Sequence, residues 1–63
     1  MNSFYDVQQL LKKFGTYVYT KDIKSDCDLM EFELDELHQS GLLATEDYLK
    51  AKVLVRKRRS EQS

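Results

Sequence analysis

Apolar residues recur at helical spacing in the first part of the chain. They stand three or four positions apart, at Phe4, Val7, Leu11 and Phe14. This spacing places side chains along one side of an α-helix, so it predicts a helix over about residues 3–14. Ser3 and Asp6 have the spacing of a capping box, and Gly15 can adopt the left-handed conformation that ends a helix.

A second, longer stripe follows, with residues at alternating steps of four and three. Its members are Ile23, Cys27, Met30, Leu34, Leu37 and Gly41. This a/d seam predicts a helix over about residues 24–40, with Asp22 or Ser25 as its cap. At its end, we expect Gly41 to be left-handed and Leu42 to fold back on the last turn.

A third stripe, at Tyr48, Ala51 and Val55, predicts a helix over about residues 46–59. Thr45 is the expected cap, and the short preceding loop makes the last two helices antiparallel. The sequence thus predicts an all-α protein, a small three-helix bundle in which residues 1–63 form a single domain and residues 60–63 fray.

The three stripes together predict the hydrophobic core. It contains Phe4, Val7, Leu11, Phe14, Met30, Leu34, Leu37, Tyr48, Ala51 and Val55, with Cys27 as a further core residue. Residues 16–20 alternate between β-branched and aromatic residues, as in a strand, but no second such run can pair with them. We therefore expect a connecting segment that places Val18 or a tyrosine on the bundle.

Length and composition narrow the functional classes. The chain has 63 residues, of which 41% are hydrophobic and 33% charged. This favours a folded domain but leaves little room for an enclosed catalytic cleft. There is neither an apolar run of membrane-spanning length nor a signal-peptide pattern at the start, so we expect a soluble cytoplasmic protein with no membrane partner.

Charge is distributed unevenly along the chain. Residues 1–49 carry ten acids and four bases, net −6, whereas residues 50–63 carry six bases and one acid, net +5. The basic cluster consists of Lys50, Lys52, Arg56, Lys57, Arg58 and Arg59. Clustered cations favour nucleic acid, because binding releases counterions from the phosphates. The alternative is internal neutralisation, with Asp28 near Lys57 and Asp26 near Arg59.

The arrangement of these bases favours a flexible strand over a duplex. At about 100° per residue, Arg56, Arg58 and Arg59 point in different directions, and we expect them to extend beyond the bundle. Tyr17 and Tyr19 are candidate stacking platforms for bases, although they can equally serve to cover the core. The predicted nucleic-acid-binding residues are Lys50, Arg56, Lys57, Arg58, Arg59, Lys12, Lys13, Tyr17 and Tyr19.

Other constellations favour structural roles. His38 lies near a predicted helix end, where a cation interacts well with the helix dipole. The acids of the second helix are scattered around a solvated side. We expect no enzyme, no metal site, no cofactor and no small-molecule substrate, because the corresponding motifs are missing. A DNA-binding helix-turn-helix is disfavoured, since Glu46 and Asp47 would begin its recognition helix.

Three segments resemble the YqgQ-like family of short proteins from Gram-positive bacteria. They are residues 10–19 (LLKKFGTYVY), 28–34 (DLMEFEL) and 41–51 (GLLATEDYLKA). The resemblance implies a cytoplasmic three-helix bundle without established enzymatic activity, for which single-stranded nucleic-acid binding is the leading suggestion. The last hairpin separately resembles a short bacterial oligomerisation module.

These observations predict a small binding module. The first hypothesis is weak binding of single-stranded RNA or DNA, and the alternative is a protein-protein interaction or oligomerisation module without a nucleic-acid role. A homodimer is also expected, because Leu29, Phe32, Leu49 and Val53 lie outside the main stripes.

Overall fold

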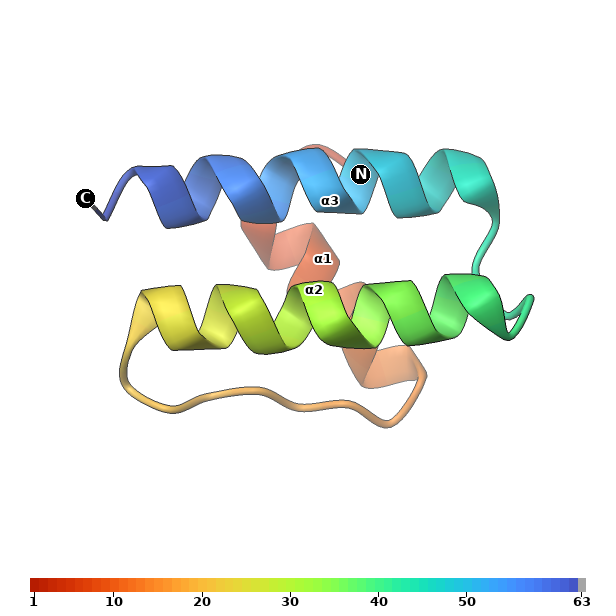
Figure 1. Ribbon diagram of the computed structural model, residues 1–63, viewed down its shortest axis with the longest axis horizontal. Coiled ribbons are helices and arrows are strands. Elements are labelled where there is room, and N and C mark those ends of the chain that lie inside the picture. The colour runs from red at the N-terminus through yellow and green to blue at the C-terminus, as the bar shows by residue number, and fades with distance from the viewer. Residues whose placement is uncertain (63) are drawn as a thin grey trace.

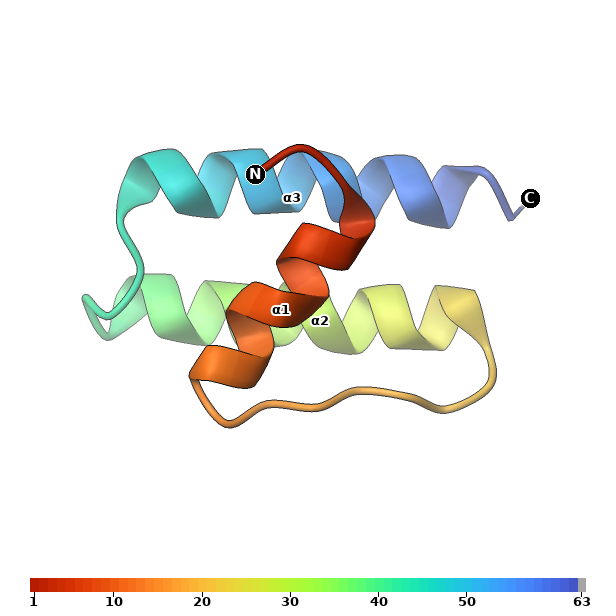
Figure 2. The same ribbon diagram turned by 180° about the vertical axis from the view of Figure 1, so that it is seen from behind.

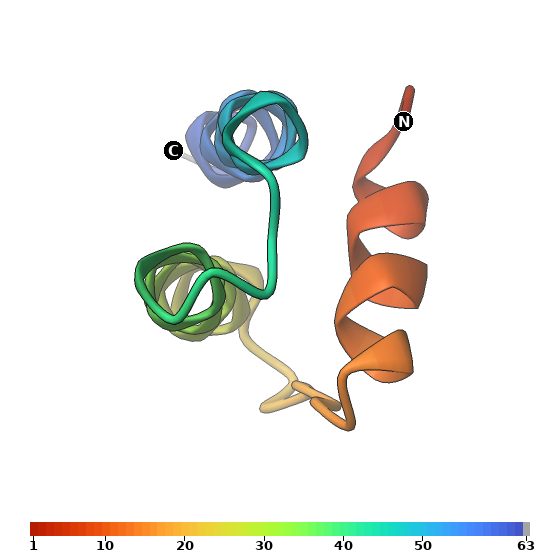
Figure 3. The ribbon, with the colours of Figure 1, turned by 90° about the vertical axis from the view of Figure 1, so that its right-hand side faces the viewer.

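The computed structural model describes residues 1–62 and contains three helices. They are α1 (Phe4–Lys13), α2 (Ile23–Gln39) and α3 (Thr45–Ser60). The helices α2 and α3 form an antiparallel hairpin, and α1 crosses one side of it (Figures 1 and 2). The end-on view shows α2 and α3 as one layer with α1 as the second (Figure 3). The predicted three-helix bundle is confirmed, with each helix end within one residue of its predicted position.

Two of the three helix starts have the predicted type of cap. In α1, Ser3 Oγ accepts a hydrogen bond from the Asp6 N–H and Asp6 Oδ2 accepts one from the Ser3 N–H, so the capping box is present. Asp22 caps α2 by accepting from the Lys24 N–H at 3.3 Å. The prediction of Thr45 as the cap of α3 is wrong. Thr45 is already helical, and the cap position belongs to Ala44, which has no side-chain acceptor.

Glycine ends both of the first two helices, as predicted. Gly15 and Gly41 have φ values of 84° and 80°, and the Leu42 N–H donates to the Leu37 carbonyl at 3.0 Å, which completes a Schellman motif. The expectation that Leu42 folds back is wrong, because Leu42 is 63% exposed and Leu43 is buried. The Leu43 N–H also reaches the Leu37 carbonyl, so the chain turns far enough to bury the second leucine.

The core lies between the hairpin and α1. Its fully buried apolar residues are Val7, Leu11, Cys27, Met30, Leu34, Leu43, Ala51 and Val55. Phe4, Leu37 and Tyr48 pack against them while half buried. The prediction that Phe14 belongs to the core is wrong, since it is 39% exposed. Because α1 crosses the hairpin instead of running along it, its last turn passes beyond the buried centre (Figure 2).

The segment between α1 and α2 is extended and is fastened mainly by polar groups. Val18 packs against the core, as expected. Asp26 is 5% exposed, and its Oδ1 accepts hydrogen bonds from both the backbone N–H and the hydroxyl of Thr20, each 2.7 Å long. The Thr16 hydroxyl donates to Glu33 at 3.3 Å. Within residues 1–62, no β-strand forms.

The C-terminal end of α3 extends further than the sequence predicted. Ser60 is helical, and the Glu61 N–H donates to the Lys57 carbonyl at 3.2 Å. The helix thus includes Ser60, one residue beyond its predicted end, while the fraying of residues 60–63 stays a prediction, and Ser63 lies outside the described residues. Among the described helices, none has the length and apolarity needed to cross a membrane.

Candidate nucleic-acid interface

Most of the predicted basic cluster is engaged with the acids of α2. A ladder of ion pairs connects the two helices of the hairpin through Asp28, Glu31 and Asp35 on α2 and Lys52, Arg56 and Arg59 on α3. Members on each helix are three or four positions apart, so both sets lie on facing stripes. Internal neutralisation, the alternative interpretation of the basic cluster, is therefore present.

The tightest contacts of this ladder are at its two ends. Arg59 Nε donates to Asp28 Oδ1 at 2.8 Å, and this carboxylate raises the pKa of Arg59. Lys52 Nζ donates to Asp35 at 3.0 Å. Partial burial lowers the pKa of Lys52, but the Asp35 hydrogen bond and the charge of Glu31 outweigh it, so the net effect is a raised pKa. Lys52 thus stays charged and is committed to α2.

The predicted partnership of Asp26 with the basic end is wrong. The Asp26 carboxylate points to Thr20 and fastens the connecting segment. Arg59 pairs with Asp28, which the predicted hairpin register had placed near Lys57, and Lys57 is exposed and forms no ion pair within residues 1–62. Lys57 is therefore the member of the cluster most available to a phosphate.

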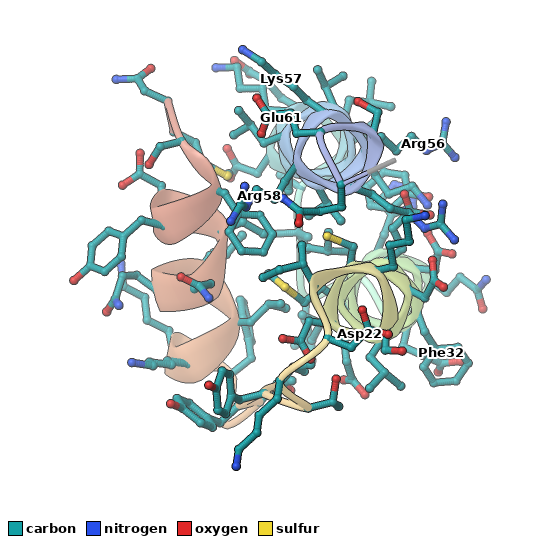
Figure 4. All side chains as sticks on the ribbon, turned by 90° about the vertical axis from the view of Figure 1, so that its left-hand side faces the viewer. Asp22, Phe32, Arg56, Lys57, Arg58 and Glu61 are labelled. Atoms are coloured by element: carbon teal, nitrogen blue, oxygen red, sulfur yellow. The ribbon has the colours of Figure 1, made fainter. Side chains whose placement is uncertain are left out.

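The remaining bases point elsewhere, as the helical spacing predicted. Arg58 lies on the α1 side, where its guanidinium carbon is 5.9 Å from the centre of the Phe4 ring, while Arg56 lies on the opposite side (Figure 4). Arg58 also approaches Glu61 at 3.7 Å, and Lys50 pairs with Glu46 at 3.2 Å. The arginines are held along α3 and do not extend beyond the bundle, so the expectation that they project past its end is wrong.

The predicted stacking residues lie in a different place, beside a hollow between α1 and the connecting segment. Tyr17 and Tyr19 are 73% and 65% exposed, and both line this hollow of about 130 Å³. In an extended segment, alternate side chains share a side, so both rings lie opposite the inward-facing Val18. Lys12 Nζ lies 5.1 Å from the centre of the Tyr17 ring.

Three residues of α1 complete this group, which we call the tyrosine hollow. Tyr5, Gln8 and Gln9 line it together with Lys12, Tyr17 and Tyr19. Tyr5 and the two glutamines were not assigned to a site from the sequence. The signal was present in the steps of three and four that connect Tyr5, Gln8, Gln9 and Lys12 on one side of α1.

The predicted binding residues therefore fall into two groups. Lys12, Tyr17 and Tyr19 meet at the tyrosine hollow, with Lys13 exposed next to Lys12 in the last turn of α1. The other group, Lys50, Arg56, Lys57, Arg58 and Arg59, is distributed around α3. The basic residues of α3 and the tyrosines therefore do not combine into one continuous surface.

His38 takes part in a compact polar group at the turn between α2 and α3. Its ring stacks on Tyr48, with centroids 4.1 Å apart, and its Nε2 lies 3.0 Å from the Thr45 hydroxyl. The Tyr48 hydroxyl donates to Asp35 at 2.6 Å, which lowers the pKa of Asp35 and raises that of Tyr48. These contacts hold the hairpin together. Across residues 1–62, no group of three or more potential ligands is arranged to hold a metal ion.

The described geometry defines a small all-α domain with an aromatic hollow on one side and a charged hairpin on the other. The profile of the YqgQ-like family matches residues 1–61. The chain is also 44% identical over 57 residues to "Uncharacterized protein YqgQ" of Bacillus subtilis (strain 168), with 90% of this chain and 80% of that protein covered. The chain belongs to the YqgQ-like family, which confirms the resemblance found in the sequence.

Proposed function

We propose that this protein is a small, non-enzymatic module that binds single-stranded nucleic acid, with the tyrosine hollow as its main contact surface. The observation that carries the proposal is the grouping of three exposed tyrosines and Lys12 around one hollow. Every base offers an aromatic face, and stacking on a protein ring is worth about 1 to 3 kcal/mol per base. A duplex keeps its bases stacked inside, so a flexible strand is the appropriate ligand.

The side chains around the hollow are suited to binding a ligand rather than to catalysis. Amides such as those of Gln8 and Gln9 can both donate and accept hydrogen bonds at base edges. Lys12 and Lys13 supply charge for the phosphates. The titratable groups nearest to an enzyme-like arrangement, His38, Tyr48 and Asp35, are occupied with one another and with the turn.

The basic end of α3 has a secondary part in this proposal. Exposed ion pairs are worth about 0 to 1 kcal/mol, so a phosphate can compete for Arg56 or Arg59. Lys57 has no ion pair within residues 1–62 that a phosphate would have to displace. These α3 residues add positive potential, whereas the hollow provides a stacking surface for the nucleotide bases. The acids of α2 keep the affinity low.

Fluorescence anisotropy of a labelled single-stranded oligonucleotide tests the proposal. Tyr17→Ala should weaken binding by about fivefold or more, because one stacking platform is lost. Tyr17→Phe keeps the ring and should bind like the parent. Lys12→Ala should weaken binding, whereas Lys24→Ala, which removes another exposed lysine, from α2, is the matched control and should not.

Salt dependence separates the hollow from the basic end. If Lys12 and Lys13 are the main phosphate contacts, the slope of log K against log salt should be about −1.4 for a single strand. An Ala variant of Arg56, Lys57, Arg58 and Arg59 should then bind only moderately more weakly. Loss of all binding in that variant, with Tyr17→Ala unaffected, would contradict the assignment to the hollow.

We assign this function to the cytoplasm, where the single free thiol of Cys27 is compatible with the reducing conditions. The second candidate function, protein interaction, is favoured by a different observation on the opposite side of the molecule, described next.

A further inference from the structure

The hairpin exposes three large apolar side chains, flanked by charged residues, on the side away from α1. We call this surface the outer face, and it consists of Asp28, Phe32 and Asp35 on α2 and Leu49, Val53 and Arg56 on α3. Each set has the i, i+4, i+7 spacing that places residues on one stripe. Phe32 and Arg56 both point away from α1 (Figure 4). The exposed fractions of Phe32, Leu49 and Val53 are 58%, 57% and 66%.

The two helices beneath this face carry opposite charges. Within α2 there are six acids and one lysine, whereas α3 has six bases and two acids. On the outer face itself, Asp28 and Asp35 flank Phe32 on α2 and Arg56 follows Val53 on α3, so a negative edge lies beside a positive one. A surface of this kind is complementary to a second copy of itself, provided that the copy is turned so that α2 meets α3.

We propose that the outer face binds a second copy of this chain, related by a two-fold axis that runs parallel to α2 and α3. Two face-to-face arrangements have two-fold symmetry. A two-fold axis in the plane of the interface and perpendicular to the helices places α2 on the partner's α2, so like charges oppose each other. An axis along the helices places α2 on the partner's α3, makes every neighbouring pair of helices antiparallel, and produces a four-helix bundle.

The ladder of ion pairs gives the register of this dimer. Lys52 pairs with both Glu31 and Asp35, so Lys52 lies opposite the point on α2 midway between these two residues. Because the helices are antiparallel, Val53 is then level with Phe32. A two-fold axis parallel to the helices leaves each residue's position along the helix direction unchanged. Phe32 of one copy therefore packs on Val53 of the other, and the contact occurs twice by symmetry.

The size of the face indicates a reversible dimer. A 17-residue helix such as α2 is about 25 Å long, and packed helices lie about 8 to 10 Å apart, so the outer face has an area on the order of 500 Å². Two copies would bury on the order of 1,000 Å² in total, which is at the lower end for specific interfaces. Apolar contacts supply the affinity, while the charges select the orientation.

Sedimentation equilibrium of the full chain provides the first test. The parent should show a concentration-dependent monomer–dimer equilibrium. Phe32→Ala should weaken it about tenfold or more, because each dimer loses two central aromatic contacts. Leu42→Ala is the matched control, since Leu42 is 63% exposed but lies in the turn, away from the outer face. Its dimerisation should remain within about twofold of the parent.

A monomer at every accessible concentration would overturn the proposal and assign the face to a different protein. A dimer that forms equally well with Phe32→Ala would also overturn it. Circular dichroism on each variant confirms the helix content. Oligonucleotide binding by Phe32→Ala at low concentration reports on the tyrosine hollow alone, so failure of one proposal is distinguishable from failure of the other.

Disulfide crosslinking tests the direction of the axis. Phe32→Cys and Val53→Cys chains are mixed and oxidised, and such a mixed dimer still contains one native Phe32–Val53 contact. The native Cys27 is completely buried, and burial raises the pKa of its thiol, so the parent is the unreactive control. Crosslinking should occur only in the mixture. A disulfide formed by Phe32→Cys alone would support the axis across the helices and overturn the one proposed.

Discussion

The α2–α3 hairpin and the α1 side of the molecule are held in different ways. Six of the eight fully buried apolar residues belong to the hairpin and its turn, whereas α1 contributes Val7 and Leu11. The ladder of ion pairs further joins α2 to α3. The connecting segment, in contrast, depends largely on Val18 and on hydrogen bonds from Thr16 and Thr20.

This difference gives a short chain a firmly packed hairpin and a more weakly held α1 side. Regions with few buried apolar contacts open locally at a lower free energy than the rest of a protein. The tyrosine hollow lies between α1 and the connecting segment, on the less strongly held side. The outer face, in contrast, lies on the more firmly held hairpin, as the proposed symmetric interface requires.

The largest expected effect concerns the hairpin core. Leu34→Ala should lower the free energy of unfolding by about 2 to 5 kcal/mol, because Leu34 is completely buried between the three helices. This is close to the total stability of so small a domain. Urea unfolding followed by circular dichroism measures the loss. Leu11→Ala on α1 provides the comparison, and an equal or larger cost there would contradict the greater strength of the hairpin.

A smaller effect is expected at the fastening of the connecting segment. Asp26→Ala should cost about 1 to 3 kcal/mol, because it leaves the Thr20 N–H and hydroxyl without their buried acceptor. Hydrogen exchange should accelerate in residues 14–22 before it does in α2 or α3. Asp28→Ala, which removes an exposed carboxylate two positions later, should leave this exchange unchanged. Uniform acceleration in all helices would show that the segment is not a separate unit.

The start of α3 offers a gain in stability within the hairpin. Ala44 has the extended conformation of a cap, with φ −62° and ψ 147°, but no side-chain acceptor. Ala44→Ser should therefore stabilise the protein by about 0.5 to 1 kcal/mol, as measured by thermal unfolding. Thr45→Ala should have a smaller effect, since Thr45 is not the cap. A loss of about 1 kcal/mol or more in Thr45→Ala would support the threonine as the true cap.

The smallest expected effect is a pH dependence in the hairpin. Tyr48 and then Lys52 hydrogen bond to Asp35, which lowers its pKa from the ordinary 3.8. Asp35 therefore contributes stability at pH values above 3.8, and this contribution is lost as the pH falls through the lowered folded-state pKa. Tyr48→Phe should reduce the stability near neutral pH, and its difference from the parent should disappear in acid. A difference that persists at low pH would indicate lost packing instead.

The sequence predicted the helices well because their signals are local. The capping box of Ser3 and Asp6 and the left-handed Gly15 and Gly41 depend on atoms within five positions of one another. The a/d seam of α2 and the short turn at residues 40–44 likewise determined the antiparallel hairpin. The prediction of a cap at Thr45 failed because the helix begins one residue earlier, with Thr45 as its first residue, and local pattern alone does not resolve a shift of one position.

The candidate sites were less predictable, because they combine residues that are distant in sequence. The hairpin register predicted that acids of α2 lie near the basic end of α3, but it did not predict that Asp28 pairs with Arg59. The retention of Asp26 by Thr20 depended on the path of residues 14–22 across the edge of α2. In the same way, Tyr5 joined Tyr17 only because α1 folds back toward that segment.

The sequence by itself determined three helices, their ends and the antiparallel order of the last two, since hydrogen bonds and apolar stripes along a helix involve near neighbours. Only the tertiary structure decided that α1 crosses the hairpin, so that Phe14 stays exposed while Leu43 is buried. The same crossing separated the tyrosines from the basic end of α3. Such choices depend on side-chain packing between segments, where small differences in shape and in the satisfaction of buried polar groups select one arrangement among several that the same stripes allow.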